Sequence, residues 1–390
     1  MIISSYRRLR VAPIIYIGRY ASDIYRSNLF SGSIVFQGIT NRNKGDFSYC
    51  YDHKRLVESN EDKEEKTAYI RDRINYFLHY NPETRFMFFA QNYFEEFLPD
   101  LDRNLFVGLN EKSINSLLDS KVFSRLWMRN YVPSLHYYVT TYADVSIKRI
   151  NQVFNKSNAF IIQADNGRGG DGSYIFRNTR ELDSFMKNTQ TSKVRFSRMI
   201  VSPYYEDSIH INQHIIIFDS LIIALQPSIE ILVEKECRLH YLGADYAQFN
   251  DWDQAVQARK DINKKSVSIA KAMQRAGFKG VAGIDYLYTN NELFFIEINP
   301  RFQGSSPLLS WELSKKNLPD LYMLNYRAFT NKPPSNNEKD ELERLVLNKK
   351  IEKIYGDPER ANAATIDKLD GALEEYLYCS PNARLGYRIT

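Results

Sequence analysis

The amino-acid sequence predicts an α/β protein, with α+β lobes in which strands and helices are partly separated. Three observations indicate this class. The chain has 390 residues, more than a single typical domain. Its N-terminal part alternates short apolar runs with polar, helix-compatible stretches, and from Asn158 onward the pattern changes to hairpins. With 43% apolar and 25% charged residues, the chain has the ordinary composition of a globular protein.

Residues 1–110 are expected to form an N-terminal α/β lobe. Three apolar runs, Val11–Gly18, Gly32–Gly38 and Arg85–Asn92, are separated by stretches that are compatible with helices. This spacing is typical of parallel strands joined through helices, so we expect a parallel sheet here.

The second predicted part, residues 111–330, begins with a helical segment from about Glu111 to Arg129. Alternating isoleucines over residues 209–217 predict a half-buried strand, and apolar spacing over residues 253–276 predicts a long helix. The last part, residues 331–390, contains at least one amphipathic helix. We expect it to be a helical tail or a substrate-covering lid region.

Charge and cysteine content exclude several classes of protein. The net charge of +5 favours an anionic ligand but is too dispersed for a nucleic-acid stripe, so no nucleic-acid partner is expected. Cys50, Cys237 and Cys379 are far apart and show no C-x-x-C spacing, which fits a reducing, cytoplasmic setting. The N-terminus lacks the pattern of a secretory signal, and the most apolar stretch, Ile215–Leu225, is too short to cross a membrane.

Polar side chains interrupt two neighbouring apolar segments, VAGIDYLY and LFFIEINPR. Asp285 stands in the first, and Glu297, Asn299 and Arg301 occupy every second position of the next, so these three share one face of a strand. Carboxylates among apolar neighbours are costly unless a cation or donors meet them. Two carboxylates and an amide oxygen suit Mg²⁺, with Mn²⁺ as an alternative, and Arg301 adds positive charge without competing for the metal.

The register of this hairpin decides whether its carboxylates meet. Asp285 and Glu297 share a face only if they pair, which an odd-numbered turn such as Asn290–Glu292 provides. A two-residue turn would place them on opposite faces. A strand end in which Arg301 simply neutralises Glu297 fits the sequence equally well.

A glycine-rich loop, NGRGGDG at residues 166–172, joins two apparent strands. Glycines permit left-handed backbone angles and let main-chain N–H groups approach an anion closely. The loop lacks the lysine signature of a P-loop and precedes a strand rather than a helix, which excludes the common nucleotide-binding fingerprints. A phosphate-covering flap and a plain hairpin tip remain.

The conjunction of GRGGDG with GIDYLY and FFIEINPRFQGSS resembles the ATP-grasp superfamily of ATP-dependent ligases, over about Asn110 to Thr330. The resemblance implies an ATP-grasp fold with an N-terminal α/β pre-ATP-grasp lobe, and ATP and Mg²⁺ as cofactors. It implies that Asp285, Glu297 and Asn299 bind the metal and that Arg301 contacts the reacting phosphoryl or acyl-phosphate group.

The same resemblance implies eight nucleotide-binding residues: Lys121, Gln163, Gly169, Gly170, Gly172, Val201, Ser202 and Glu206. The glycines would close over the phosphates, and the lysine would reach toward the nucleotide. The hinge residues Val201 and Ser202 would face adenine, and Glu206 would bind the ribose. Family members usually have a lysine where this chain has Gln163, whose amide can form hydrogen bonds but supplies no charge.

Weaker signals come from histidines and from a basic pair. His210 and His214 would be about 13 Å apart along a strand, too far for one ion, so we expect satisfied sheet histidines. Lys235 and Arg238 could hold a substrate carboxylate as a charged fork, which makes Arg238 a second candidate catalytic residue, although a solvated pair explains them equally well.

The sequence therefore predicts an ATP-dependent carboxylate–amine ligase that forms an amide (peptide) bond through an acyl phosphate. Its substrates would be a small-molecule carboxylic acid and an amine, one of them carried by a protein or peptide in some of these systems. The stretch SPYYEDSIHIN is most similar to ligases of natural-product peptide assembly of the butirosin and pheganomycin types. A kinase of the same superfamily and a non-catalytic ATP-binding protein are the alternatives.

Overall fold

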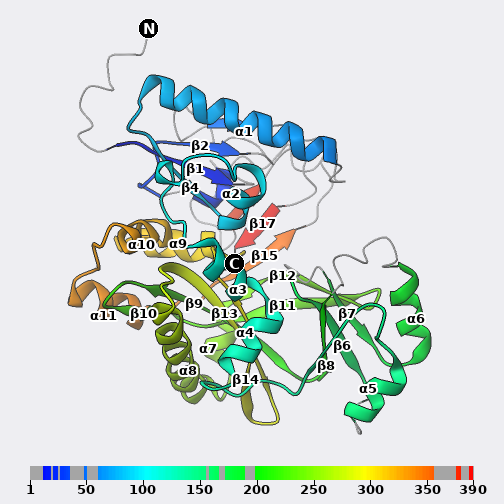
Figure 1. Ribbon diagram of the computed structural model, residues 1–390. Coiled ribbons are helices and arrows are strands. Elements are labelled where there is room, and N and C mark those ends of the chain that lie inside the picture. Colours follow the sequence, from blue (N-terminus) through cyan, green and yellow to red (C-terminus); the bar gives the residue numbers. More distant parts are fainter. Residues whose placement is uncertain are drawn as a thin grey trace.

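A computed structural model describes most of the chain and gives its architecture (Figure 1). The described residues are 12–18, 21–24, 27–35, 48–50, 60–154, 158–166, 172–188, 198–354, 375–378 and 386–389. Two sheets organise these residues, a small one near the N-terminus and a large one that fills the remainder of the molecule. In the described part of the chain, no helix is long and apolar enough to span a bilayer.

The N-terminal lobe contains a parallel sheet with strand order β3-β2-β1-β4. Its strands are β1 (Ile14–Gly18), β2 (Gly32–Val35), β3 (Ser48–Cys50) and β4 (Arg85–Phe88). Every residue of β1 and β2 is buried, as expected for a parallel sheet that is covered on both faces. Helix α1 (Asn60–Tyr80) packs on the sheet through Ile70 and Ile74. The parallel strands predicted for this part are confirmed.

The large sheet is mainly antiparallel, with strand order β14-β13-β9-β11-β12-β7-β6-β8-β5, and β10 and β15 to β17 attach to it. The strands of this path and β10 are β5 (Tyr138–Thr140), β6 (Phe160–Ala164), β7 (Ser173–Phe176), β8 (Met199–Pro203), β9 (Ile209–Ile217), β10 (Ile222–Ala224), β11 (Ser228–Lys235), β12 (Arg238–Asp245), β13 (Gly280–Thr289) and β14 (Glu292–Asn299).

Helices cover both sheets. They are α2 (Gln91–Phe97), α3 (Lys112–Asp119), α4 (Lys121–Met128), α5 (Ile147–Val153), α6 (Thr179–Asn188), α7 (Tyr246–Asp251), α8 (Ala255–Arg275), α9 (Ser306–Lys315), α10 (Leu321–Phe329) and α11 (Asn336–Arg344), with short 3-10 turns η2 (Ala21–Ile24) and η3 (Arg103–Leu105). Asn178 caps α6, because its side chain accepts a hydrogen bond from the Glu181 N–H.

Different hydrophobic cores pack on the two regions of the large sheet that carry the site. One joins β6, β7 and β8 to α5 and α6, and includes Ile150, Phe160 and Phe185. The other joins β9, β13 and β14 to α8, and includes Ile215 and Ile269. Figure 1 shows the β6–β8 lobe to one side of the strands β9, β13 and β14. The side chains discussed below come from both of these regions.

The β13–β14 hairpin reaches its register by a different route from the one expected. Thr289 pairs with Glu292, so the turn has only two residues, Asn290 and Asn291, both with positive φ. A β-bulge follows, in which Ile296 is the additional residue, and beyond it Asp285 pairs with Glu297. The predicted pairing is confirmed, but the odd-numbered turn is wrong, because the bulge supplies the extra residue.

The helix expected from Glu111 to Arg129 is interrupted at Ser120. This residue has an extended backbone (φ −77°, ψ 117°), ends α3, and caps α4 by accepting a hydrogen bond from the Phe123 N–H. The serine side chain therefore starts a new helix in the middle of the predicted one. As a result, Lys121 occupies the first position of α4.

The C-terminal part is not only helical. Helix α11 begins with a capping box between Ser335 and Glu338, but the strands β15 (Lys350–Ile354), β16 (Glu375–Tyr378) and β17 (Gly386–Ile389) follow it. β15 pairs with β12 and with β17. The segment is therefore not purely helical, because β15 extends the large sheet, and the alternative of a substrate-covering lid region stays a prediction.

Candidate active site

Polar residues on three adjacent strands form a hydrogen-bonded cluster. The Asp285 carboxylate on β13 accepts hydrogen bonds from Asn212 Nδ2 on β9 at 2.5 Å and from Asn299 Nδ2 on β14 at 2.7 Å. Asn299 Oδ1 in turn accepts one from Arg301 Nη2 at 2.9 Å. Since Asp285 also pairs with Glu297 across the hairpin, the four residues predicted from the two apolar segments meet in one place.

Lys121 neutralises Glu297. Its Nζ atom lies 2.5 Å from Glu297 Oε2, and the two side chains are only 7% and 18% exposed. Burial alone would raise the pKa of Glu297, but Lys121, a hydrogen bond with Asp285 and the nearby Arg125 outweigh burial and hold that pKa below its ordinary value. Glu297 is therefore an ionised carboxylate inside the protein.

Two further carboxylates beside Glu297 are harder to ionise. Burial, and secondly the charge of Glu297, raise the pKa of Asp285 to about 7. Glu230 on β11 has its pKa raised well above the ordinary value by burial and by the charges of Asp285 and Glu297. A divalent cation would relieve this repulsion, and carboxylate and amide oxygens are the ligands that Mg²⁺ prefers. The residues present therefore fit Mg²⁺.

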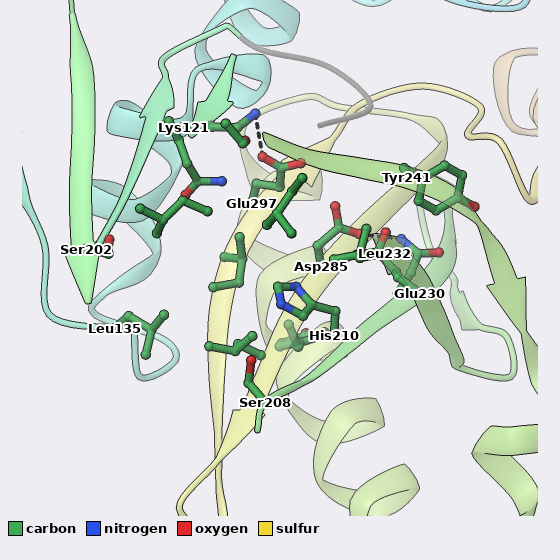
Figure 2. Close-up of a pocket in the computed structure, with 18 of the residues that line it drawn as sticks. Lys121, Leu135, Ser202, Ser208, His210, Glu230, Leu232, Tyr241, Asp285 and Glu297 are labelled. Atoms are coloured by element: carbon green, nitrogen blue, oxygen red, sulfur yellow. Dashed lines mark hydrogen bonds and ion pairs between the residues drawn. The ribbon is translucent and has the colours of Figure 1, made fainter. Parts of the chain in front are cut away.

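These groups line one cavity between the two regions of the large sheet. Figure 2 shows Lys121 and Glu297 meeting at one side of it, with Asp285 and Glu230 nearby and Ser202 and Leu135 farther along. The cavity also has apolar walls, formed by Leu135, Ile161, Leu232, Leu239, Leu287 and Ile296. It thus combines a charged end with an apolar slot, the usual composition of a small-molecule site.

Arg125 on α4 connects the walls of the cavity. It is 1% exposed, and it donates hydrogen bonds from Nη1 to Ser202 Oγ at 3.1 Å and from Nη2 to Gln163 Oε1 at 2.7 Å. Burial lowers the pKa of Arg125 to about 10, so the guanidinium remains charged at neutral pH. Gln163 and Ser202, both predicted nucleotide-binding residues, thus lie at the cavity, whereas the Val201 side chain is buried in the core of the β6–β8 region.

The base of the glycine-rich loop is fixed to the start of α4. Asp165 accepts hydrogen bonds from Ser120 Oγ at 2.7 Å and from the Val122 N–H at 2.9 Å, and its carbonyl accepts one from the Lys121 N–H. At the other end of the loop, Gly172 has a φ of +88°, which only glycine adopts without strain. Gly169 and Gly170 lie outside the described residues.

Two predicted residues lie away from the charged cluster. Glu206 lines an adjoining cavity of about 480 Å³ and forms an ion pair with Arg177 at 3.2 Å. The Arg238 guanidinium lies over the ring of Tyr174, 4.8 Å from its centroid, and Arg238 lines neither cavity. The structure therefore does not bring Arg238 together with Arg301.

The two histidines of β9 differ in their surroundings. His214 Nε2 lies 2.8 Å from Ser306 Oγ, and burial lowers the pKa of His214 to about 3, so the expected satisfied sheet histidine is confirmed. His210 instead lines the cavity, and burial lowers its pKa to about 4. His210 is also a residue of the sheet, and its hydrogen-bonding role stays a prediction.

Sequence reasoning missed several cavity residues: Asn212, Glu230, Tyr241, Arg125 and Gln303. Glu230 carries a usable signal, since it stands alone between Ile229 and Ile231, as Asp285 does between Ile284 and Tyr286. Arg125 carries none, because a basic residue on a helix is ordinarily exposed.

Comparison with known proteins finds a similar domain family and one similar curated protein. Residues 120–305 match the model of the ATP-grasp domain family. A 152-residue segment is 28% identical to biotin carboxylase of Haemophilus influenzae, covering 38% of this chain and 32% of that protein. The chain thus spans about a third of that relative's length.

Solved structures show the same fold. One is the biotin carboxylase domain of the 2-oxoglutarate carboxylase of Hydrogenobacter thermophilus, crystallised with MgADP, ADP and bicarbonate (TM-score 0.68, 18% identity, 98% of this chain and 86% of that one). Another is N5-carboxyaminoimidazole synthetase of Staphylococcus aureus with ADP (TM-score 0.59, 11% identity, 98% and 94% of the two chains). The chain therefore has the ATP-grasp fold predicted from its sequence, and residues 120–305 are similar to the ATP-grasp domain family.

Proposed function

We propose that this protein is an ATP-dependent carboxylate–amine ligase. The observation that carries the proposal is the meeting of Asp285, Glu297, Asn299 and Arg301 with Lys121 in one cavity of an ATP-grasp fold. Its substrates are a small-molecule carboxylic acid and an amine. Two similar proteins support this class: biotin carboxylase, and a structural neighbour crystallised with MgADP and bicarbonate, an anion whose CO₂⁻ group resembles a carboxylate.

The reaction begins when a carboxylate oxygen of the acid attacks the γ-phosphorus of ATP. The bond from that phosphorus to the β–γ bridging oxygen breaks, and ADP leaves. The amine nitrogen then attacks the acyl carbon, inorganic phosphate leaves, and the nitrogen releases a proton to solvent. The product is an amide, and no nucleophile from the protein is required.

The main obstacle is the approach of one anion to another. Arg301 places a guanidinium beside the metal-binding carboxylates. The ammonium group of Lys121, which contacts Glu297, adds a second cation. Fixed positive groups stabilise charge on the transferring phosphoryl group without needing to reorganise. Asp285, Glu297 and Asn299 would hold Mg²⁺, which supplies positive charge to phosphate oxygens when bound.

The nucleotide would occupy the rest of the cavity. Its base fits the apolar slot beside Ser202 and the neighbouring Val201 backbone, with Gln163 between the slot and the charged end. The loop glycines Gly169, Gly170 and Gly172 would cover the phosphates. Glu206 would reach the ribose after exchanging its contact with Arg177.

The finer assignment is to the assembly of natural-product peptides, in the cytoplasm, with one substrate attached in some cases to a carrier protein or peptide. The similarity of SPYYEDSIHIN to such ligases supports it.

The test is a coupled assay of ADP release with panels of carboxylic acids and amines, followed by mass spectrometry. The proposal predicts ADP release that needs both substrates and an amide product. Phosphorylated acceptor without amide would show a kinase instead. Binding of MgATP without turnover on any pair would show a non-catalytic ATP-binding protein.

A further inference from the structure

We propose that Arg125 is a positioning residue of the nucleotide site. It fixes the Gln163 amide with the NH₂ group toward the cavity. At this position the protein therefore donates hydrogen bonds, and the nucleotide must supply the acceptor. The inference deepens the proposed function and rests on it. The acceptor is either a nitrogen of the purine or a phosphate oxygen.

Hydrogen bonds hold the Arg125 guanidinium in one position. Its guanidinium donates to three separate strands: from Nε to the Ile296 carbonyl at 2.9 Å, from Nη1 to Ser202 Oγ at 3.1 Å, and from Nη2 to Gln163 Oε1 at 2.7 Å. The ring of Tyr137 lies 5.7 Å from the guanidinium carbon. A buried charge is costly unless its donors are satisfied, so the guanidinium stays in the one place where all three acceptors surround it.

This geometry determines the orientation of Gln163. A guanidinium has only donors, so the glutamine atom that meets it must be the acceptor, Oε1. The other amide atom, Nε2, is then directed away from Arg125. Gln163 is only half-buried and lines the cavity with Lys121 and Ser202, so Nε2 offers its N–H groups there.

The same guanidinium links this amide to the metal-binding carboxylates. Ile296, whose carbonyl it holds, is the additional residue of the bulge that places Glu297 opposite Asp285. Ser202 belongs to β8 and Gln163 to β6, on the other side of the cavity. One side chain therefore ties the nucleotide subsite to the strand that carries Glu297 and Asn299.

A double-mutant cycle on MgATP affinity tests the proposal, with binding measured by isothermal titration calorimetry. In the wild-type background, Gln163→Ala should weaken MgATP binding about tenfold, because an oriented donor is lost. In an Arg125→Lys background, the same change should cost less than about twofold, because the amide is no longer held. Arg129→Lys, an exposed arginine of the same helical region, is the matched background and should leave the full tenfold effect.

Equal effects of Gln163→Ala in the Arg125→Lys and Arg129→Lys backgrounds would overturn the inference and reduce Arg125 to a structural role. If wild type does not bind MgATP, the proposed function and the inference both fail. If it binds MgATP and shows coupling but makes no amide, only the proposed function fails.

A second variant covers the case in which Arg125→Lys does not fold. Gln163→Glu keeps an acceptor for Arg125 but removes both cavity-facing donors, so it should fold normally and lose MgATP affinity at least tenfold. Unchanged affinity would contradict the proposed orientation. Repeating the Gln163→Ala measurement with 7-deaza-ATP tests N7 as the acceptor. The effect disappears if the partner is N7 of the purine and persists if it is a phosphate oxygen or another purine nitrogen, and either result supports the proposal.

Discussion

The protonation state of each carboxylate in the candidate active site depends on the charged groups nearest to it. Glu297 is ionised because Lys121 lies against it, whereas Asp285 shares the same region and has its pKa raised to about 7 by burial and by the charge of Glu297. Two carboxylates with pKa values shifted in opposite directions form a typical functional pair. Sequence patterns identified both residues but could not assign the difference between them, because Lys121 approaches from a distant segment.

Removal of Arg301 should impair chemistry without unfolding the protein. Loss of one donor to the transferring phosphoryl group typically costs about 3 kcal/mol, so Arg301→Ala should reduce turnover about a hundredfold or more. Arg327→Ala, which breaks a partly exposed pair with Glu338, is the control and should leave turnover unchanged. Steady-state ADP release and thermal melting report both effects. Turnover of Arg301→Ala within a few fold of wild type would remove this residue from the mechanism.

Acid should destabilise the protein partly through His214. The pKa of His214 is about 3 in the folded protein, below the ordinary 6.5, so the folded state favours the neutral ring. The stability that depends on this neutral ring is fully present above pH 6.5 and is lost as pH falls toward 3. Each unit by which the pH falls within that window lowers the free energy of unfolding by about 1.4 kcal/mol. His214→Gln, which can still contact Ser306, should reduce the drop in unfolding free energy between pH 7 and pH 5 measured with urea. The exposed His79→Gln is the control, and an unchanged drop in His214→Gln would exclude this histidine as the cause.

At the scale of secondary-structure elements, two local irregularities, the bulge in the β13–β14 hairpin and the helix break at Ser120, position the side chains of the site. The two-residue turn at Asn290-Asn291 would send Asp285 and Glu297 to opposite faces, and the bulge at Ile296 restores them to the same face. The apolar alternation predicted both strands and their pairing, but a bulge has no reliable sequence signal when the extra residue is another isoleucine of an apolar run. The break at Ser120 was missed because serine, although it favours helix N-caps, also occurs inside helices, so its presence alone does not mark the start of a helix.

The cap at Ser120 should affect both stability and catalysis. Ser120→Ala removes the bond to the Phe123 N–H and the bond to Asp165, and should cost about 1–2 kcal/mol of unfolding free energy. Because Lys121 is the next residue, turnover should fall as well. Ser146→Ala removes the equivalent cap of α5, away from the cavity. It should cost similar stability and leave turnover unchanged; equal turnover in the two variants would show that the cap does not position Lys121.

At the scale of the whole molecule, the site lies where two separately packed regions of one sheet meet. Parallel strands in the N-terminal lobe and the main hairpins were predictable, because apolar periodicity sets them. The addition of β15 to the large sheet and the burial of Arg125 were not, because both depend on contacts between segments far apart in the chain. The same reason explains why Asn212 was absent from the predicted site, whereas the signal of Glu230 was overlooked.

The central claim is that acidic side chains of β13 and β14 bind the divalent cation that accompanies the phosphates of ATP. A crystal structure with a non-hydrolysable ATP analogue and Mn²⁺, examined by anomalous scattering, tests it most directly. We expect an anomalous peak within coordination distance of Asp285 and Glu297, with the base in the slot beside Ser202. A nucleotide bound elsewhere, or a Mn²⁺ peak that contacts neither carboxylate, would contradict the claim.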